Sequence, residues 1–315
     1  MREITKNANN GVAMTVRGID VSSRFFWEVA LPVFESEFPS YIDRIAVGLV
    51  AAGSDCAGND DGVSRDFDWG PRLQAFLTEQ DFNEIGADVQ SALDGLPNIF
   101  HGTCCRPSGL HSSTVYYIDS FFIKNTFNPA LNIGFSHAPQ SAADWLRIPE
   151  YRLFDLAHGQ VFYDPIGEFT ERRKEFMAYY PNDAWKRLIF AALRDCSEYG
   201  ERLLPRSIAH DDYYTAQIAW WNFSESILKL GFLLNRCYAP RKQWLYREFC
   251  KLPLDSSRVV DLLWDGQNDI VPKIDLVGRI AAIYGRRLHQ FGLIRKTPNG
   301  SPGSFDLWSS DIHYT

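Results

Sequence analysis

The segment around an apolar run at residues 45–52 does most to limit the folds open to this chain. The run, Ile-Ala-Val-Gly-Leu-Val-Ala-Ala, has the length of a buried strand, and length is all that separates it from a piece of helix. Gly53 and Ser54 follow directly, then a polar loop rich in Gly and Asp, and then Asp-Phe-Asp-Trp at residues 66–69. Alternation with a period of two predicts a second strand there.

Two aspartates on one strand give this segment a chemical meaning. Asp66 and Asp68 stand two residues apart, so on a strand they point to the same face, separated by about 6.5–7 Å. That separation suits a pair of Mg²⁺ ions about 3.5–4 Å apart, as in two-metal phosphoryl chemistry. The turn at Gly53 and Ser54 allows close backbone approach and offers N–H groups to phosphates. These residues therefore predict a site for Mg²⁺ and a triphosphate.

The spacing of these residues resembles a known superfamily. Residues 55–65, eleven in all, separate Gly-Ser from Asp-x-Asp. A strand, Gly-Ser, a spacer of about this length and Asp-x-Asp resemble the nucleotidyltransferase (DNA polymerase β-like) superfamily. The fuller stretch 48–71, with 159–164 and 234–245, is similar to an uncharacterised bacterial DUF4037-like branch. The resemblance covers most of residues 20–260 and implies a nucleotidyltransferase-like fold, two Mg²⁺ ions, and ATP or another NTP as substrate.

The same resemblance suggests further site residues. The superfamily usually carries a third carboxylate on a later strand, and Asp119, within a β-branched and aromatic stretch at 114–123, is the candidate, with a surface aspartate as the alternative. Arg65 is a candidate nucleotide contact, because arginine binds phosphate in a bidentate manner. Asp60 and Asp61 are interpreted as residues that order the loop, with nucleotide contact as the second interpretation.

The C-terminal half is expected to be helical and to supply the acceptor side. Its clearest helix is predicted at 213–237. Glu225 is a candidate general base for the acceptor, although Glu225 and Lys229 at i and i+4 also suit a helix ion pair. Lys242 is a candidate contact for phosphate or substrate. This half resembles the acceptor domains of antibiotic nucleotidyltransferases at the level of fold only.

The fold class expected from these patterns is α+β, with a nucleotidyltransferase-like mixed sheet and flanking helices in residues 1–170 and a helical bundle in 171–315. The remaining predictions are a helix at 21–38 capped by Ser22 or Ser23, a helix in two pieces at 73–96, a loop at 97–113, a strand at 161–163, and a loosely ordered tail at 296–315.

Charge and composition exclude several classes of partner. The formal net charge is −7 and no run of Lys or Arg is present, which argues against DNA or long RNA. No stretch approaches the roughly 18 apolar residues of a membrane span, and the N-terminus lacks the apolar core of a signal peptide. Six cysteines without a short-spaced framework fit a reducing compartment. We therefore expect a cytoplasmic protein, with its oligomeric state left open.

Three functions remain in view. The first is a metal-dependent nucleotidyltransferase that moves a nucleoside monophosphate, with AMP the expected one, from an NTP to a small-molecule acceptor and releases pyrophosphate. The second is the same chemistry on a protein or a tRNA. The third is a nucleotide-binding module without turnover, against which the intact Asp66 and Asp68 argue.

Overall fold

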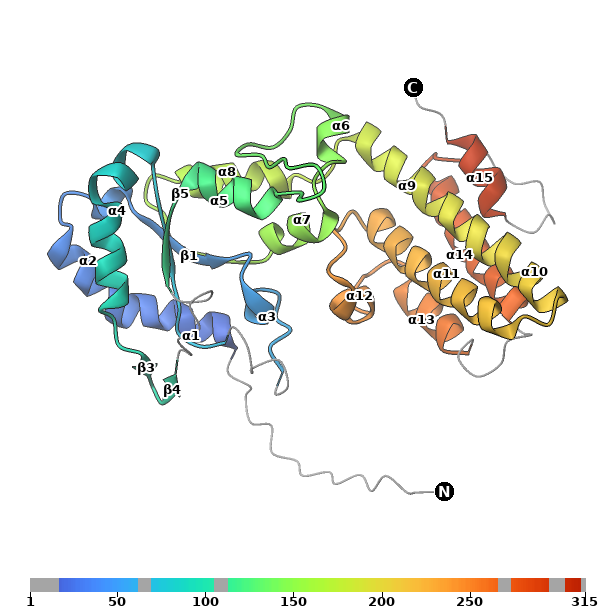
Figure 1. Cartoon of the computed structure of the whole chain (residues 1–315), viewed down its shortest axis with the longest axis horizontal. Coiled ribbons are helices and arrows are strands. Elements are labelled where there is room, and N and C mark those ends of the chain that lie inside the picture. The colour runs from blue at the N-terminus through green and yellow to red at the C-terminus, as the bar shows by residue number, and fades with distance from the viewer. Residues whose placement is uncertain (1–16, 62–68, 105–112, 266–272, 295–303, 313–315) are drawn as a thin grey trace, which may run out of the picture. The chain divides into compact units, whose positions relative to one another are not determined.

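The computed structural model describes residues 17–61, 69–104, 113–265, 273–294 and 304–312 (Figure 1). The contacts within the chain divide it into two compact units. Unit 1 comprises Met1–Phe121 and His158–Glu171, and unit 2 comprises Phe122–Ala157 and Arg172–Thr315. A domain boundary near residue 170 stays a prediction.

A mixed four-stranded sheet forms the centre of unit 1, and the predicted α+β class is confirmed. The strand order is β5-β2-β1-β6, with β1 antiparallel to both of its neighbours and β2 parallel to β5. The strands are β1 (Ala46–Val50), β2 (Gln74–Leu77), β5 (Thr114–Tyr117) and β6 (Gly159–Tyr163). A separate short pair joins β3 (Ile99–Phe100) to β4 (Thr103–Cys104).

The register of the sheet determines which chain segments share an edge. Gly48 is opposite Gln74, Val50 is opposite Gly159, and Gln74 is opposite Thr114. The end of β1 therefore lies at the same edge as the starts of β2, β5 and β6. We call this the turn edge, because the Gly-Ser turn follows β1 there.

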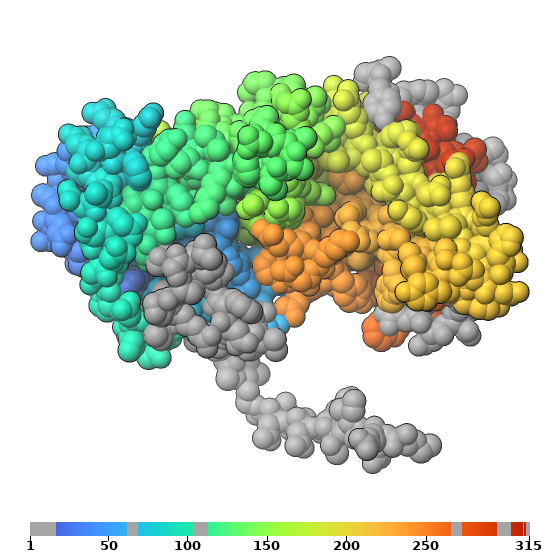
Figure 2. Space-filling model, viewed as in Figure 1, coloured from blue at the N-terminus to red at the C-terminus, as the bar shows by residue number. Residues whose placement is uncertain are grey.

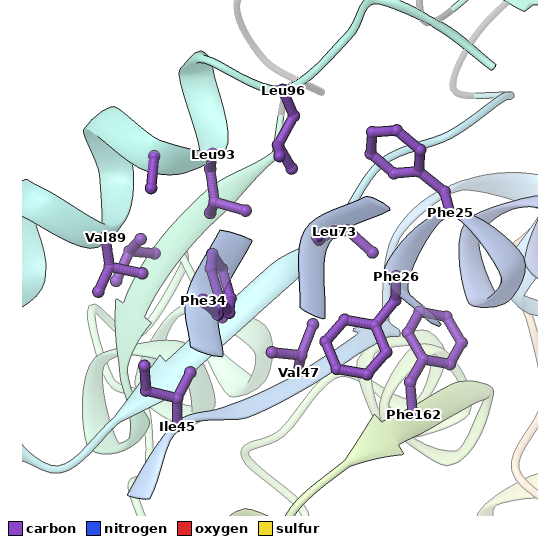
Figure 3. Close-up of a cluster of buried hydrophobic side chains, with 14 of the residues drawn as sticks. Phe25, Phe26, Phe34, Ile45, Val47, Leu73, Val89, Leu93, Leu96 and Phe162 are labelled. Atoms are coloured by element: carbon purple, nitrogen blue, oxygen red, sulfur yellow. The ribbon is translucent and has the colours of Figure 1, made fainter. Parts of the chain in front are cut away.

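One face of the sheet is covered by α1 (Gly18–Phe25), a π-helical turn at Phe26–Ala30, α2 (Leu31–Glu37) and α4 (Glu79–Asp94). Figure 3 shows Phe34 from α2 and Val89 from α4 packed with Val47 from β1 in this core. Each fully buried side chain of this size stabilises the fold by about 1.5–3 kcal/mol. The π-helical turn is followed by Pro32, which cannot donate the N–H bond that an α-helix needs.

The other face of the sheet carries an aromatic cluster. Phe76 of β2 stacks on Phe169, with ring centroids 3.8 Å apart, and meets Phe121 edge to face at 4.9 Å. Ala75 and Leu77 point instead into the core of the first face. The alternation along β2 thus buries both faces of the sheet.

Unit 2 is largely helical, as predicted for the C-terminal half. The long helix α11 (Tyr213–Leu234) packs on α9 (Asn182–Cys196), and Asp212 caps it by accepting a bond from the N–H of Thr215 at 3.0 Å. Figure 2 shows these helices from one side, coloured yellow to orange. The other helices are α6 (Ala142–Trp145), α7 (Glu150–Ala157), α10 (Leu204–Ala209), α12 (Lys242–Phe249), α13 (Ser256–Asp265), α14 (Lys273–Gln290) and α15 (Phe305–Asp311); α5 (Ile118–Thr126) and α8 (Glu168–Met177) contain residues of both units.

Two predicted elements of unit 1 are wrong in part. The helix expected at 73–96 begins only at Glu79, because the first residues form β2 between β1 and β5, and Thr78 caps α4 by accepting from the N–H of Asp81 at 3.1 Å. The strand expected at 114–123 ends at Tyr117, where α5 begins.

Two predictions about chain ends are also wrong. Ser22 does not cap the first helix, because the helix begins at Gly18 and Ser22 lies within it. The hydroxyl of Ser22 donates to the carbonyl of Gly70 at 3.1 Å. The tail contains α15, whose Phe305 and Trp308 are buried. Glu201 holds the start of α15 by accepting from the N–H of Phe305 at 2.8 Å.

Candidate functional site

The turn at the end of β1 has the backbone shape that its sequence predicts. Ala51 and Gly53 both adopt positive φ angles, +55° and +75°. Glycine takes such a conformation without penalty, whereas alanine is strained by about 1 kcal/mol. The chain then enters the short helix α3 (Gly53–Cys56), in which Ser54 is buried.

A buried polar network holds this turn from the start of β2. The side-chain oxygen of Gln74 accepts a hydrogen bond from the N–H of Val50 at 2.8 Å. Arg72 is 4% exposed and donates from Nη2 to the carbonyl of Ala52 at 2.9 Å and to Oδ1 of Asp55 at 2.7 Å. The guanidinium group thus links β2 to both sides of the turn, and a buried charge paired in this way is not free to bind a ligand.

Asp55 is the acidic member of this network. Burial raises the pKa of its carboxyl group to about 6, even though the charge and hydrogen bond of Arg72 act to lower it. Its Oδ1 also accepts from the N–H of Cys56 at 2.9 Å, while its buried Oδ2 has no hydrogen-bond partner among the described residues. Oδ2 packs against Gly18, where an added Cβ would lie 2.8 Å from it.

A second aspartate joins the two ends of the loop that follows the turn. Oδ2 of Asp60 accepts from the indole Nε1 of Trp69 at 2.9 Å and from the N–H of Gly18 at 2.7 Å. These bonds give Asp60 the ordering role assigned to it. Arg65, Asp66 and Asp68 lie between these two anchors, outside the described residues.

Asp119 is not beside the turn. It follows the end of β5, and β5 runs parallel to β2, so Asp119 lies at the edge opposite the turn edge. In the view of Figure 1, α5, which carries Asp119, lies higher than α3. The expectation that Asp119 sits on a strand is wrong, and its position counts against a shared metal site with a residue at the turn.

Glu225 and Lys242 pair with each other within unit 2. The carboxylate of Glu225 lies 2.7 Å from the ammonium of Lys229 and 2.8 Å from that of Lys242. Partial burial acts to raise the pKa of Glu225, but the hydrogen bonds and charges of the two lysines lower it overall. A lowered pKa makes Glu225 a weaker base, so the ion-pair interpretation fits this residue better than the general-base one.

Sequence reasoning missed Asp55, Arg72 and Gln74 as members of the turn. Gln74 begins β2 and Arg72 lies two residues before it, so extended backbone through both positions would have placed the two side chains on one face. Asp55 directly follows Gly-Ser, and only the buried position of its partner distinguishes it from the other acids of the loop.

No metal-binding group is complete within the described residues. These residues contain no cluster of three or more His, Cys, Asp or Glu side chains that could hold a metal ion. Asp66 and Asp68 offer the carboxylate oxygens that Mg²⁺ prefers, and the anchored loop ends on either side of them are compatible with such a site. Within the same part of the chain, no helix combines the length and apolar character needed to cross a bilayer.

Comparison with known proteins identifies one segment. No curated protein matches the chain, and none of the comparisons links it to the nucleotidyltransferase superfamily. Residues 145–245 match the model of a domain of unknown function, DUF4037. The predicted DUF4037-like character is therefore confirmed for this segment, which runs from α6 through β6 to α12.

Proposed function

We propose that the chain is a metal-dependent nucleotidyltransferase that transfers a nucleoside monophosphate, AMP in the first instance, from an NTP to a small-molecule acceptor. The observation that carries the proposal is the Gly53–Ser54 turn at the end of β1, together with the hydrogen bond between Asp60 and Trp69, the residues that flank the segment containing Asp66 and Asp68. Asp60 also accepts from the N–H of Gly18, and Gly18 packs against Asp55, the residue after the turn.

The proposal assigns a role to each group at the turn edge. Backbone N–H groups at Gly53 and Ser54 bind the outer phosphates, because a glycine with positive φ allows close approach. Asp66 and Asp68 would hold Mg²⁺, which when bound neutralises the triphosphate charge. Arg72 stabilises the turn through its hydrogen bond to the carbonyl of Ala52. Arg65 remains a candidate phosphate contact.

The decisive experiment measures pyrophosphate release by the full chain with ATP, Mg²⁺ and a mixture of small metabolites, and mass spectrometry identifies any product heavier by AMP. We expect Asp66→Asn and Asp68→Asn each to lower release by about a thousandfold, since loss of metal binding removes about 4 kcal/mol of transition-state stabilisation. Wild-type release by either variant would overturn the assignment.

Asp119→Asn is the matched control. It makes the same chemical change at the opposite edge of the sheet, so its pyrophosphate release should stay within about twofold of the wild type. Parallel reactions with tRNA and with protein extract distinguish the small-molecule acceptor from the macromolecular alternative. Stabilisation by ATP and Mg²⁺ without pyrophosphate release from any mixture would favour the non-catalytic module.

A further inference from the structure

Glu150, the first residue of α7, carries a carboxylate of unit 2 that takes part in one hydrogen bond among the described residues. Its Oε1 accepts a hydrogen bond from the N–H of Ala239 at 3.1 Å, and its side chain is half-buried. Among the described residues it has no ion-pair partner. Burial raises the pKa of Glu150 to about 7, whereas the Ala239 bond and the charge of Lys229 act to lower it.

Two other carboxylates of unit 2 have ion-pair partners. Asp155, on the same helix, lies 3.0 Å from Arg241. Glu225 is bound at once by Lys229, at 2.7 Å, and by Lys242, at 2.8 Å. The lysine whose charge reaches Glu150 is therefore held by another acid. Within the described part of the chain, Asp155 and Glu225 thus have cationic partners in direct contact, whereas Glu150 has none.

Three tyrosine rings lie near this carboxylate, because Ala239, whose N–H bonds to Glu150, directly follows Tyr238. Tyr179, Tyr180 and Tyr238 contact one another with ring centroids 4.9–5.1 Å apart. Burial, and then the charge of Glu150, raises the pKa of all three hydroxyl groups. Tyr179 is half-buried, so part of the cluster remains open to solvent.

The aromatic cluster already accepts one cation. The guanidinium of Arg236 lies 5.8 Å from the ring centroid of Tyr179 and 3.3 Å from that of Trp185, and it donates to Oδ1 of Asn182 at 3.2 Å. Aromatic faces attract cations through the negative charge above the ring. Arg236 is therefore an example of a cation bound by these rings. Its hydrogen bond goes to Asn182 and not to Glu150.

A half-buried charge without a partner is costly, and proteins normally pair such groups or bind an ion to them. A carboxylate bordered by tyrosine rings has the chemistry that recognises a protonated or quaternary amine. We propose that Glu150, with Tyr179, Tyr180 and Tyr238, forms a binding site for an organic ammonium group. The site is complete within unit 2 and needs no nucleotide, so it stands or falls separately from the transferase proposal.

The test uses three small probes that differ in charge but share a skeleton. Choline carries a quaternary ammonium and ethanolamine a primary one, while 3,3-dimethylbutan-1-ol is the uncharged isostere of choline. Calorimetric titration of the full chain at pH 8, without nucleotide, should give a Kd of about 1–10 mM for at least one ammonium probe. The uncharged isostere should bind at least about tenfold more weakly, because it lacks the attraction to carboxylate and rings.

Glu150→Gln should weaken ammonium binding by about tenfold or more, since it removes the charge and keeps the shape. Glu175→Gln is the matched control: Glu175 also accepts a backbone N–H, that of Ala138 at 3.1 Å, but is exposed, and its variant should bind within about twofold of the wild type. Wild-type binding should also weaken about tenfold from pH 8 to pH 6 as Glu150 is protonated. Burial raises the pKa values of the three tyrosine hydroxyls, so these groups stay neutral in that range.

Each outcome decides the matter. Equal binding of choline and its isostere, unchanged binding by Glu150→Gln, or no binding of either ammonium probe up to about 20 mM would each overturn the site. If Glu150→Gln fails to fold, the isostere comparison and the pH dependence on the wild-type chain still decide. A preference for choline or for ethanolamine identifies the kind of ammonium group that the site takes.

Discussion

The turn in unit 1 and the tyrosine cluster in unit 2 each hold a carboxylate whose pKa is raised by burial, and they treat it in opposite ways. Asp55, with a pKa of about 6, lies 2.7 Å from the buried guanidinium of Arg72. Glu150, with a pKa of about 7, contacts no cation among the described residues. The first arrangement is closed and shapes the backbone, whereas the second leaves a charge for something outside the chain to meet.

The largest effect expected from this contrast concerns Arg72. Arg72→Met should lower the free energy of unfolding by about 3–5 kcal/mol, because it leaves Asp55 buried without its partner. The measurement is urea denaturation followed by circular dichroism. Arg241→Met breaks a pair whose arginine is 40% exposed and should cost about 1 kcal/mol or less. Equal losses of unfolding free energy in the two variants would contradict the prediction that the ion pair at the turn contributes more stability than the pair in unit 2.

A second prediction compares the two carboxylates by pH. A carboxyl group with a raised folded-state pKa stabilises the fold at low pH and loses that contribution as pH rises through the folded-state value. Relative to Asp55→Asn, the wild type should therefore lose about 3 kcal/mol of stability between pH 4 and 6. Relative to Glu150→Gln, it should lose about 2 kcal/mol between pH 4.5 and 7, less than burial alone implies because the side chain keeps some contact with water.

At pH 8, where both carboxylates are charged, the two variants should nevertheless change stability in different directions, because Asp55 pairs with Arg72 and Glu150 pairs with no described cation. Asp55→Asn removes the partner of a buried arginine and destabilises the fold, while Glu150→Gln removes an unpaired charge and stabilises it. Thermal denaturation of both variants at pH 5 and pH 8 provides the measurement. A Glu150→Gln chain that is less stable than the wild type at pH 8 would mean that Glu150 already has an internal partner.

The smallest effect is expected at Lys242. Its ammonium contacts Glu225, but the side chain is exposed and Lys229 binds the same carboxylate. Lys242→Met should therefore change the free energy of unfolding by about 0.5 kcal/mol or less, and added salt should shrink the difference further. A loss above about 2 kcal/mol in denaturant titration would show that the pairs of unit 2 are as structural as that of Asp55 and Arg72.

Local patterns in the sequence predicted a large part of this fold. The apolar run that becomes β1, the glycine turn after it, β6 and the long helix α11 all follow from periodicity or from glycine geometry within a few residues. Positions decided by distant partners were missed. The residues of β2 were predicted as the start of a helix. Their strand conformation depends on the pairing of Gln74 with Gly48 and Thr114, which the local sequence does not show.

The candidate sites divide in the same way. The turn itself was predicted. The position of Asp119, at the edge of the sheet opposite the turn, depends on the direction of β5, and no local sequence pattern gives that direction. Glu150 carries no signal in the sequence at all. Its state depends on Ala239, 89 residues away, and on tyrosines from two other segments of the chain.

The late position of β6 in the chain has a consequence for synthesis on the ribosome. β1 is a central strand, yet one of its two neighbours, Gly159–Tyr163, is translated more than a hundred residues after it. Until that segment leaves the exit tunnel, β1 presents an unpaired edge of the kind that recruits other chains. Nascent chains stalled before residue 158 should accordingly stay bound to chaperones. The chaperones should dissociate once β6, which lies in the segment that matches DUF4037, has emerged.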